Sequence, residues 1–155
     1  MNLLIADDEN LELKVLEKTI KKFFLNELEI FMASNGKQAA QISDETEINI
    51  ALLDIEMPGM NGIELAKLLR EKNPDCIIIF ITAYDRFDYA IEAMHIKAFD
   101  YLLKPWKDEK LTGLISEAIV NIKELSLENS VNENLQESQK SAIKKYIKEN
   151  YKRDI

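Results

Sequence analysis

The chain has 155 residues, with 28 acidic and 20 basic side chains, one cysteine and 46% hydrophobic residues. This length suits one domain with an appendage, and the apolar content is enough to bury a core. One cysteine excludes an internal disulfide, no apolar stretch approaches the roughly 20 residues that span a bilayer, and the early acidic residues do not fit a secretory signal. We therefore expect a cytoplasmic protein with no membrane partner.

The negative charge lies in the first two thirds of the chain. Residues 1–105 carry 19 acidic and 11 basic side chains, whereas residues 106–155 carry nine of each. The first part should therefore repel nucleic acid. Residues 138–155 have six basic and two acidic side chains, which fits either a solvated helix face or a surface for an acidic partner.

Strand patterns alternate with helix patterns through most of the chain. Short continuous apolar runs predict strands buried on both faces, and apolar residues at helical spacing predict amphipathic helices. The predicted strands are residues 3–6, 28–33, 49–54, 76–82 and 99–103. The predicted helices are residues 10–25, 36–42, 62–72 and 87–96, with a long helix from about residue 107. Five strand–helix pairs predict an α/β fold with a doubly wound parallel sheet.

The last third of the chain has a different pattern. A helical stripe of apolar residues continues to Leu125, but residues 126–141 are mostly Ser, Asn, Gln and Glu. Such a stretch buries little, which predicts a polar linker or a frayed extension of the helix. Residues 142–155 carry a second short apolar stripe that needs a surface to pack against. We therefore place the main domain at residues 1–125 and treat these two segments separately.

Four of the predicted strands end in polar side chains. In an open parallel sheet the carboxyl ends of the strands meet at one edge, where ligands bind. The residues at these ends are Asp7 and Asp8, Asp54, Thr82 and Lys104. Any one of them could have a purely structural role, such as a helix cap or an ion pair. Together, three carboxylates, a hydroxyl and an ammonium group favour a site for a divalent cation and a phosphoryl group.

The acidic cluster favours a hard cation. Two carboxylates about 4 Å apart repel by roughly 4 kcal/mol at an effective dielectric constant near 20, so a third makes the cluster costly without a cation. Oxygen ligands with room for water favour Mg²⁺ or Mn²⁺, and the scarcity of His and Cys argues against zinc. Beside such a cation Asp54 is a competent nucleophile toward phosphorus, and Thr82 and Lys104 would hold the remaining oxygens.

The residues around these strand ends resemble a known family. The motifs are Asp7-Asp8-Glu9, Asp-Ile-Glu-Met-Pro-Gly-Met-Asn-Gly at residues 54–62, Thr82-Ala83 and Lys104-Pro105. Over about residues 1–125, in the same order, they look like the receiver domain of two-component response regulators. The resemblance implies a flavodoxin-like (βα)5 fold, with a five-stranded parallel sheet in the order 2-1-3-4-5 and an extended C-terminal helix.

The resemblance implies a metal site and a phosphoacceptor. Asp54 would accept a phosphoryl group from the phosphohistidine of a sensor histidine kinase. The implied Mg²⁺ ligands are Asp7, Asp8, Asp54 and the backbone carbonyl of Glu56. A protein of this kind promotes its own phosphorylation and dephosphorylation and is not otherwise an enzyme. Glu56 lies where the family varies and where self-dephosphorylation is tuned, so the lifetime of the phosphorylated state stays open.

The resemblance also implies a switch. The Thr82 hydroxyl would turn toward the phosphoryl group, and the Tyr101 ring would swing inward behind it. Lys104 would form an ion pair with the phosphoryl group, and the peptide bond before Pro105 would be cis.

A finer resemblance concerns the output. Residues 81–90 and 98–105 look like receivers that precede AraC-type DNA-binding domains, and residues 142–151 are similar to the opening helix of such a domain. This implies transcriptional control through a homodimer formed by the fourth helix, fifth strand and fifth helix. DNA would be contacted only by an output domain of which residues 142–155 are the start. The alternative within the class is a stand-alone receiver that acts as a phosphorelay shuttle.

An alternative from another class is a Mg²⁺-dependent phosphatase with an aspartyl nucleophile, of the haloacid dehalogenase type. Such enzymes carry a second aspartate two residues after the nucleophile, as the general acid. Here that position is Glu56, and the accompanying Thr or Ser signature is missing. The residues therefore favour the receiver over this phosphatase.

Overall fold

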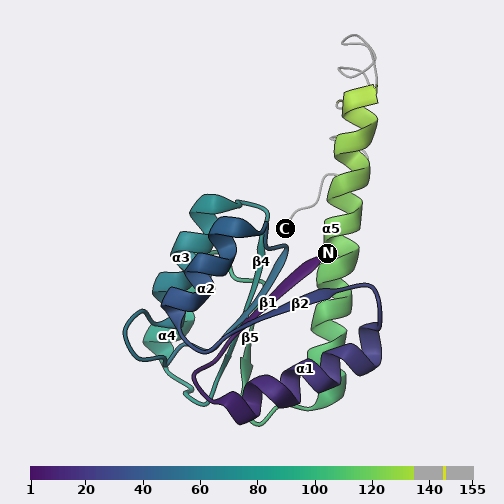
Figure 1. The fold of residues 1–155 in the computed structure, drawn as a ribbon. Helices are drawn as coiled ribbons and strands as arrows, with labels where there is room; N and C mark the ends of the chain where they lie inside the picture. The colour runs from purple at the N-terminus through teal and green to yellow at the C-terminus, as the bar shows by residue number, and fades with distance from the viewer. Residues whose placement is uncertain (135–144, 146–155) are drawn as a thin grey trace. The chain divides into compact units, whose positions relative to one another are not determined.

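Five parallel strands form one sheet in the computed structural model, which describes residues 1–134 and residue 145. The strands are β1 (Asn2–Ala6), β2 (Glu29–Ala33), β3 (Ile50–Leu53), β4 (Ile77–Thr82) and β5 (Asp100–Leu103). Their order in the sheet is β2-β1-β3-β4-β5, and every neighbouring pair is parallel. This topology confirms the predicted flavodoxin-like fold (Figure 1).

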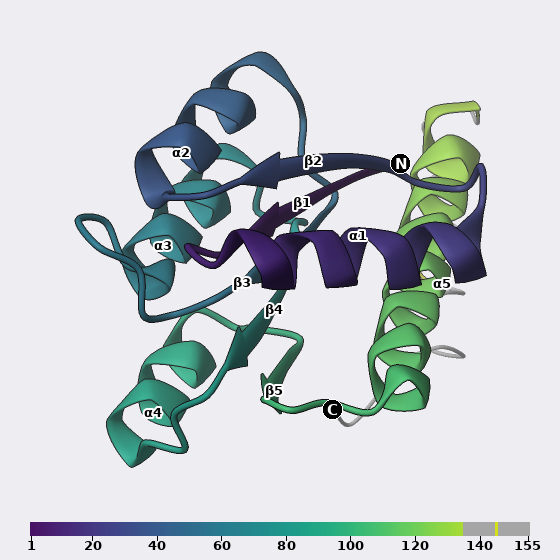
Figure 2. The ribbon, with the colours of Figure 1, turned by 60° about the horizontal axis from the view of Figure 1, so that its bottom comes forward.

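Helices cover both faces of the sheet. They are α1 (Asn10–Phe24), α2 (Gly36–Glu45), α3 (Gly62–Lys72), α4 (Phe87–His95) and α5 (Asp108–Asn134). The two views show α1 and the first part of α5 on one face and α2, α3 and α4 on the other (Figures 1 and 2). The predicted second helix stops at residue 42, where its apolar stripe ends. The structure continues it through Ser-Asp-Glu to Glu45, and the amide of the next residue, Thr46, donates to the Ile42 carbonyl.

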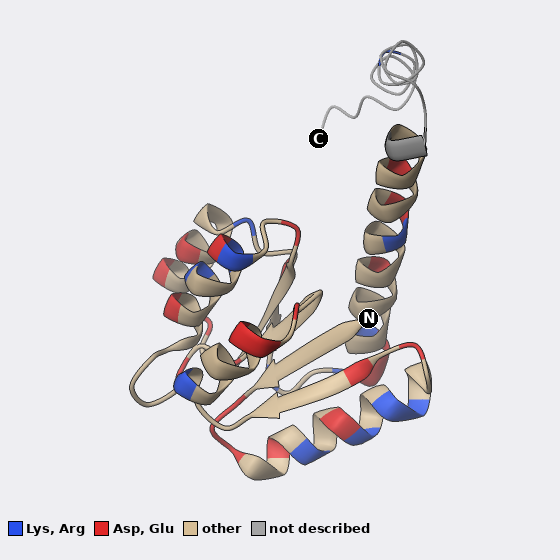
Figure 3. Cartoon of the chain, turned by 45° about the horizontal axis from the view of Figure 1, so that its top comes forward, with Lys and Arg blue, Asp and Glu red and all other residues tan. Residues whose placement is uncertain are grey.

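The strand β1 illustrates how the sheet is buried on both sides. Leu4 and Ala6 belong to a buried cluster that includes Leu65 of α3. Leu3 and Ile5 are also fully buried, and the alternation of side chains along a strand directs them to the opposite face. The strands are almost free of charged residues, whereas acidic and basic residues are interspersed along α1 (Figure 3). Burial on both faces explains the continuous apolar runs in the sequence.

The chain divides into two units, Met1–Ala118 and Ile119–Ile155. The sheet, α1 to α4 and the first part of α5 belong to the first unit. In the second unit α5 continues to Asn134, so residues 126–134 form a helical extension rather than an irregular linker. The rest of the predicted linker, and the segment 142–155 apart from Lys145, lie outside the described residues. No helix in the described part of the chain has the length and apolar composition needed to cross a membrane.

Candidate functional site: an acidic cleft

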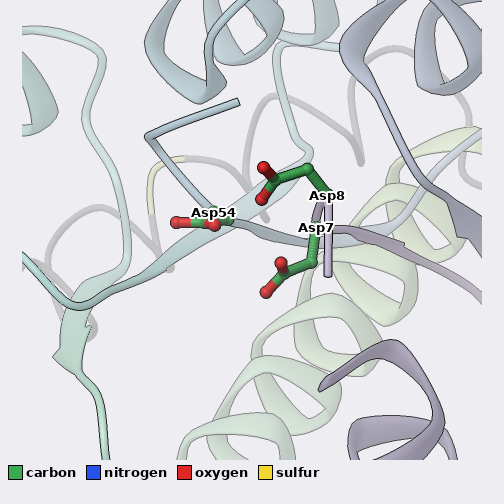
Figure 4. A group of neighbouring side chains, drawn as sticks. All are labelled: Asp7, Asp8 and Asp54. Carbon is green, nitrogen blue, oxygen red and sulfur yellow. The ribbon is translucent and has the colours of Figure 1, made fainter. Parts of the chain in front are cut away.

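Three aspartates meet at the carboxyl end of the sheet. Asp7 and Asp8 follow β1, and Asp54 follows β3, the neighbouring strand. One carboxylate oxygen from each lies within 4.8 Å of the others, and all three side chains face the same region (Figure 4). Asp7 and Asp54 are buried, whereas Asp8 is exposed. Three carboxylates at this spacing fit the oxygen ligands that Mg²⁺ or Mn²⁺ prefers, so these residues could hold a metal ion.

Two of the aspartates, Asp8 and Asp54, line a cleft of about 770 Å³. Its lining includes Asp8, Glu12, Asp54, Glu56, Lys104 and Trp106. Ala83 also lines the cleft, and its small side chain takes up little of the space. The cleft therefore has space for a cation and a phosphoryl group together.

Lys104 forms ion pairs with three carboxylates from different elements. Its Nζ lies 2.6 Å from Glu12 Oε2, 2.9 Å from Asp7 Oδ2 and 3.5 Å from Asp54 Oδ2. The Lys104 side chain is only 10% exposed. Burial by itself lowers the pKa of this ammonium group, but the Glu12, Asp7 and Asp54 carboxylates outweigh it, so the pKa is raised well above its ordinary value. Lys104 therefore keeps its positive charge in the cleft.

The Asp54 carboxyl group has a strongly perturbed acidity. Burial raises its pKa from 3.8 to about 7, the negative charges of Asp7 and Asp8 act in the same direction, and Lys104 opposes them. Perturbed carboxyl groups of this kind cluster at functional sites. Asp54 combines this perturbation with a position at the edge of the cleft, which makes it the strongest candidate for the reacting group.

The loop after Asp54 is held by a close backbone contact. A Cβ atom at Gly62 would lie 2.1 Å from the Asp54 carbonyl oxygen, so only glycine fits at this position. The Gly62 amide donates to the Ile55 carbonyl at 2.9 Å. Asn61 then starts α3 by accepting a hydrogen bond from the Glu64 amide at 2.9 Å. The turn residues of the motif thus fix the backbone that carries Asp54.

Thr82 and Tyr101 lie beside the cleft rather than among its lining residues. Thr82 is completely buried, and its hydroxyl oxygen accepts a hydrogen bond from the Tyr84 amide at 3.3 Å. The Tyr101 hydroxyl donates to the Tyr84 carbonyl at 2.6 Å. Both side chains therefore contact the loop between β4 and α4. The peptide bond between Lys104 and Pro105 is cis.

A polar cluster at the mouth of the cleft escaped the sequence analysis. Tyr89 of α4 donates its hydroxyl to the Glu56 carboxylate, and Arg86 lies 3.9 Å from the same carboxylate. The Arg86 guanidinium also lies over the Tyr89 ring, 4.4 Å from its centre. The hydrogen bond to Glu56 is the main cause that raises the pKa of Tyr89 to about 12. These contacts tie the Glu56 side chain to the start of α4.

Glu12 is the other residue of the site that the sequence analysis missed. It lies in the first turn of α1, where an acidic residue is ordinarily explained by the helix dipole. Its position four residues after Asp8 could have indicated that the helix turns this side chain back toward the aspartates. Among the predicted residues, five line the cleft directly: Asp8, Asp54, Glu56, Lys104 and Pro105.

The sequence matches the family model described as the response regulator receiver domain over residues 3–116. The chain therefore belongs to the response regulator receiver family of two-component systems. The match covers the sheet, the acidic cleft and Lys104.

Curated relatives and solved structures agree with this assignment. The chain is 40% identical over 115 residues to the sensory transduction protein LytT of Oceanobacillus iheyensis, covering 71% of this chain and 44% of that protein. It is 37% identical over 118 residues to the positive alginate biosynthesis regulatory protein of Pseudomonas aeruginosa, covering 76% of this chain and 47% of that protein. The chain thus spans less than half the length of these relatives.

Among solved structures, a receiver domain protein from Clostridium thermocellum superposes with a TM-score of 0.73 at 28% identity, covering 80% of this chain and 98% of that one. The receiver domain of AraT, a response regulator from Geobacillus stearothermophilus, gives a TM-score of 0.71 at 33% identity, covering 81% and 97%. Both similarities concern the receiver fold.

Proposed function

We propose that this receiver domain accepts a phosphoryl group on Asp54 from a sensor histidine kinase, in the presence of Mg²⁺, and passes the signal on by a change of conformation. The observation that carries this proposal is the position of Asp54. Its buried carboxylate lies beside two other aspartates and 3.5 Å from the Lys104 ammonium, at the edge of an open cleft.

The transfer is a displacement at phosphorus. An Asp54 carboxylate oxygen forms the new P–O bond while the P–N bond to the kinase histidine breaks, and the imidazole keeps the electron pair of that bond. Asp7, Asp8, Asp54 and the backbone carbonyl of Glu56 would hold Mg²⁺, which neutralises phosphoryl oxygens when bound. Lys104, whose Nζ lies 3.5 Å from Asp54 Oδ2, supplies a second positive charge. The chain carries out this self-phosphorylation and the later hydrolysis without being an enzyme for other substrates.

The switch would use Thr82 and Tyr101. In the unphosphorylated form both side chains bond to the backbone of Tyr84, in the loop between β4 and α4. A phosphoryl group on Asp54 offers the Thr82 hydroxyl a charged acceptor, which forms stronger hydrogen bonds than a neutral group. Loss of the Thr82 contact would free the loop, and Tyr101 would follow it inward. The outer face at α4 and β5 would then report the phosphorylation state.

For the output we propose transcriptional control through a C-terminal DNA-binding domain of the AraC type, in the cytoplasm. The support is the similarity to receiver-containing regulators and the resemblance of residues 142–151 to the first helix of such a domain. Phosphorylation would promote a homodimer through α4, β5 and α5. On this face Phe87 is 82% exposed and Met94 is 72% exposed. Large solvent-exposed apolar side chains favour a surface that binds a protein partner.

Phosphorylation can be tested with acetyl phosphate and Mg²⁺. We expect one acid-labile phosphate per chain, none in Asp54→Asn, and an ordinary yield in the control Asp75→Asn, whose carboxylate is exposed before β4. Labelling of Asp54→Asn to the wild-type level would refute the assignment. Steady turnover of a phosphate ester, far beyond one equivalent, would instead support the phosphatase of the haloacid dehalogenase type.

Dimerisation can be tested by measuring the mass in solution with and without beryllofluoride and Mg²⁺. We expect the mass to double on addition, and Phe87→Ser to prevent the change. Phe23→Ser, at an exposed position of α1, is the control and should still dimerise. An unchanged mass in the wild type would favour the stand-alone phosphorelay shuttle.

A further inference from the structure

Glu12 lies against Lys104 in a way that the proposed transfer does not explain. Its Oε2 atom is closed to solvent. The Lys104 ammonium lies 2.6 Å from this oxygen, so the contact is a close ion pair. Only 28% of the Glu12 side chain is exposed, so solvent screens this pair less than a surface pair.

The three carboxylates around Lys104 have different tasks in the proposed function. Asp7 would be a metal ligand and Asp54 the phosphoacceptor, whereas Glu12 has neither role. Yet Lys104 Nζ lies closest to Glu12, at 2.6 Å, and farthest from Asp54, at 3.5 Å. The ammonium group is therefore held closer to Glu12 of α1 than to the Asp54 carboxylate beside which it must act.

We propose that Glu12 is a positioning residue that holds Lys104 away from Asp54 and competes with the incoming phosphoryl group for the ammonium. This inference rests on the proposed phosphorylation of Asp54. It assigns to Glu12 the control of how much of the protein is phosphorylated at a given donor concentration and how long the phosphate remains.

The competition follows from the charges. Lys104 remains positively charged and must give one N–H donor to the phosphoryl group, so it has to leave or share a carboxylate. Metal binding would compensate the charge of Asp7, which leaves Glu12 as the main competitor. Replacing Glu12 by the nearly isosteric glutamine keeps the shape and removes this attraction. Lys104 should then move toward Asp54 before any ligand arrives.

The experiment compares Glu12→Gln with the wild type in a beryllofluoride titration at saturating Mg²⁺. Trp106 is the chain's single tryptophan and lines the cleft, so its fluorescence reports binding. Loss of a partly buried charged competitor should lower the apparent Kd by about three- to tenfold. The control is Glu17→Gln, which removes an α1 carboxylate that pairs with Lys21, and its Kd should be unchanged.

A second measurement shows whether the effect acts through the lysine. The ¹⁵N resonance of the Lys104 ammonium group, assigned with Lys104→Met, should shift in ligand-free Glu12→Gln and not in Glu17→Gln. A lower Kd without this shift would overturn the proposal, because Glu12 would then act only as a repelling charge. Should Glu12→Gln not fold, Glu12→Met removes the same charge and keeps the methylene packing.

Different results would refute the role of Glu12 and the role of Asp54 as phosphoacceptor. If the wild type binds beryllofluoride and Glu12→Gln binds it equally or more weakly, the role of Glu12 is wrong and the phosphoacceptor assignment stands. If neither the wild type nor Glu17→Gln binds beryllofluoride with Mg²⁺, the proposed function fails and the inference about Glu12 falls with it.

Discussion

Replacing Asp54 by asparagine should stabilise the metal-free protein in a pH-dependent way. The pKa of Asp54 is about 7 in the folded protein, against 3.8 for the ordinary group. A carboxyl group whose folded pKa is raised contributes stability below its unfolded pKa and loses it as the pH rises toward the folded pKa. Wild-type stability should therefore fall between about pH 4 and pH 7, whereas asparagine does not titrate.

The size of the effect follows from the same shift. One pKa unit corresponds to about 1.4 kcal/mol, so the full loss is on the order of 4 kcal/mol, and about 2 to 3 kcal/mol of it falls between pH 5 and pH 8. Relative to the wild type, Asp54→Asn should gain this amount of unfolding free energy over that interval. The attraction between the Asp54 carboxylate and Lys104 is already contained in the folded pKa of about 7, so its loss in the asparagine variant needs no separate allowance.

The assay is urea unfolding in EDTA at pH 5 and pH 8, followed by circular dichroism, with Asp75→Asn as the control. The control should follow the wild type within about 0.5 kcal/mol, as surface substitutions usually do. If the difference in unfolding free energy between Asp54→Asn and the wild type did not depend on pH, the reasoning would be refuted. Burial and the acidic neighbours would then not raise the pKa of Asp54. Mg²⁺ should restore wild-type stability at pH 8 and affect Asp54→Asn less.

Three further outcomes follow from single contacts. Gly62→Ala should cost about 3 kcal/mol of unfolding free energy and weaken Mg²⁺ binding, because the new Cβ would meet the Asp54 carbonyl. The control is Gly113→Ala in α5, which has open space around the new Cβ and should stabilise the protein by about 0.5 to 1 kcal/mol. An unchanged stability of Gly62→Ala would contradict the close contact. Arg70→Met should cost about 2 to 3 kcal/mol in urea unfolding, since the guanidinium donates to four backbone carbonyls around the start of β4 and the end of α4. Glu56→Gln should lower the pKa of Tyr89 from about 12 toward 10, measured by NMR titration of its ring, and an unchanged value would show that the Glu56 hydrogen bond is absent in solution.

The fold could be predicted largely from local patterns. Strands buried on both faces produce continuous apolar runs, and such runs end where the chain reaches the edge of the sheet, at residues such as Asp7 and Asp54. The end of α2 could not be predicted in this way, because residues 43–45 are polar and carry no periodic signal. The continuation of α5 through residues 126–134 was open for the same reason.

The sequence by itself determined which chemical groups meet at the edge of the sheet. Parallel strands bring their carboxyl ends together whatever the exact packing, so Asp7, Asp8, Asp54 and Lys104 were identifiable from their places after apolar runs. Family motifs then narrowed the chemistry to phosphoryl transfer.

Only the tertiary structure decided which of these charged groups pair with one another and which other side chains they contact. Glu12 contacts Lys104, which lies 92 positions later in the sequence, and Tyr89 contacts Glu56, which lies 33 positions earlier. Glu12 and Tyr89 lie on helices whose outer residues show no pattern that would distinguish them. Side-chain contacts between separate elements depend on the packing of those elements, which periodicity does not encode. The distances from Lys104 to its three carboxylates, on which the proposed competition rests, are therefore known only from the tertiary structure.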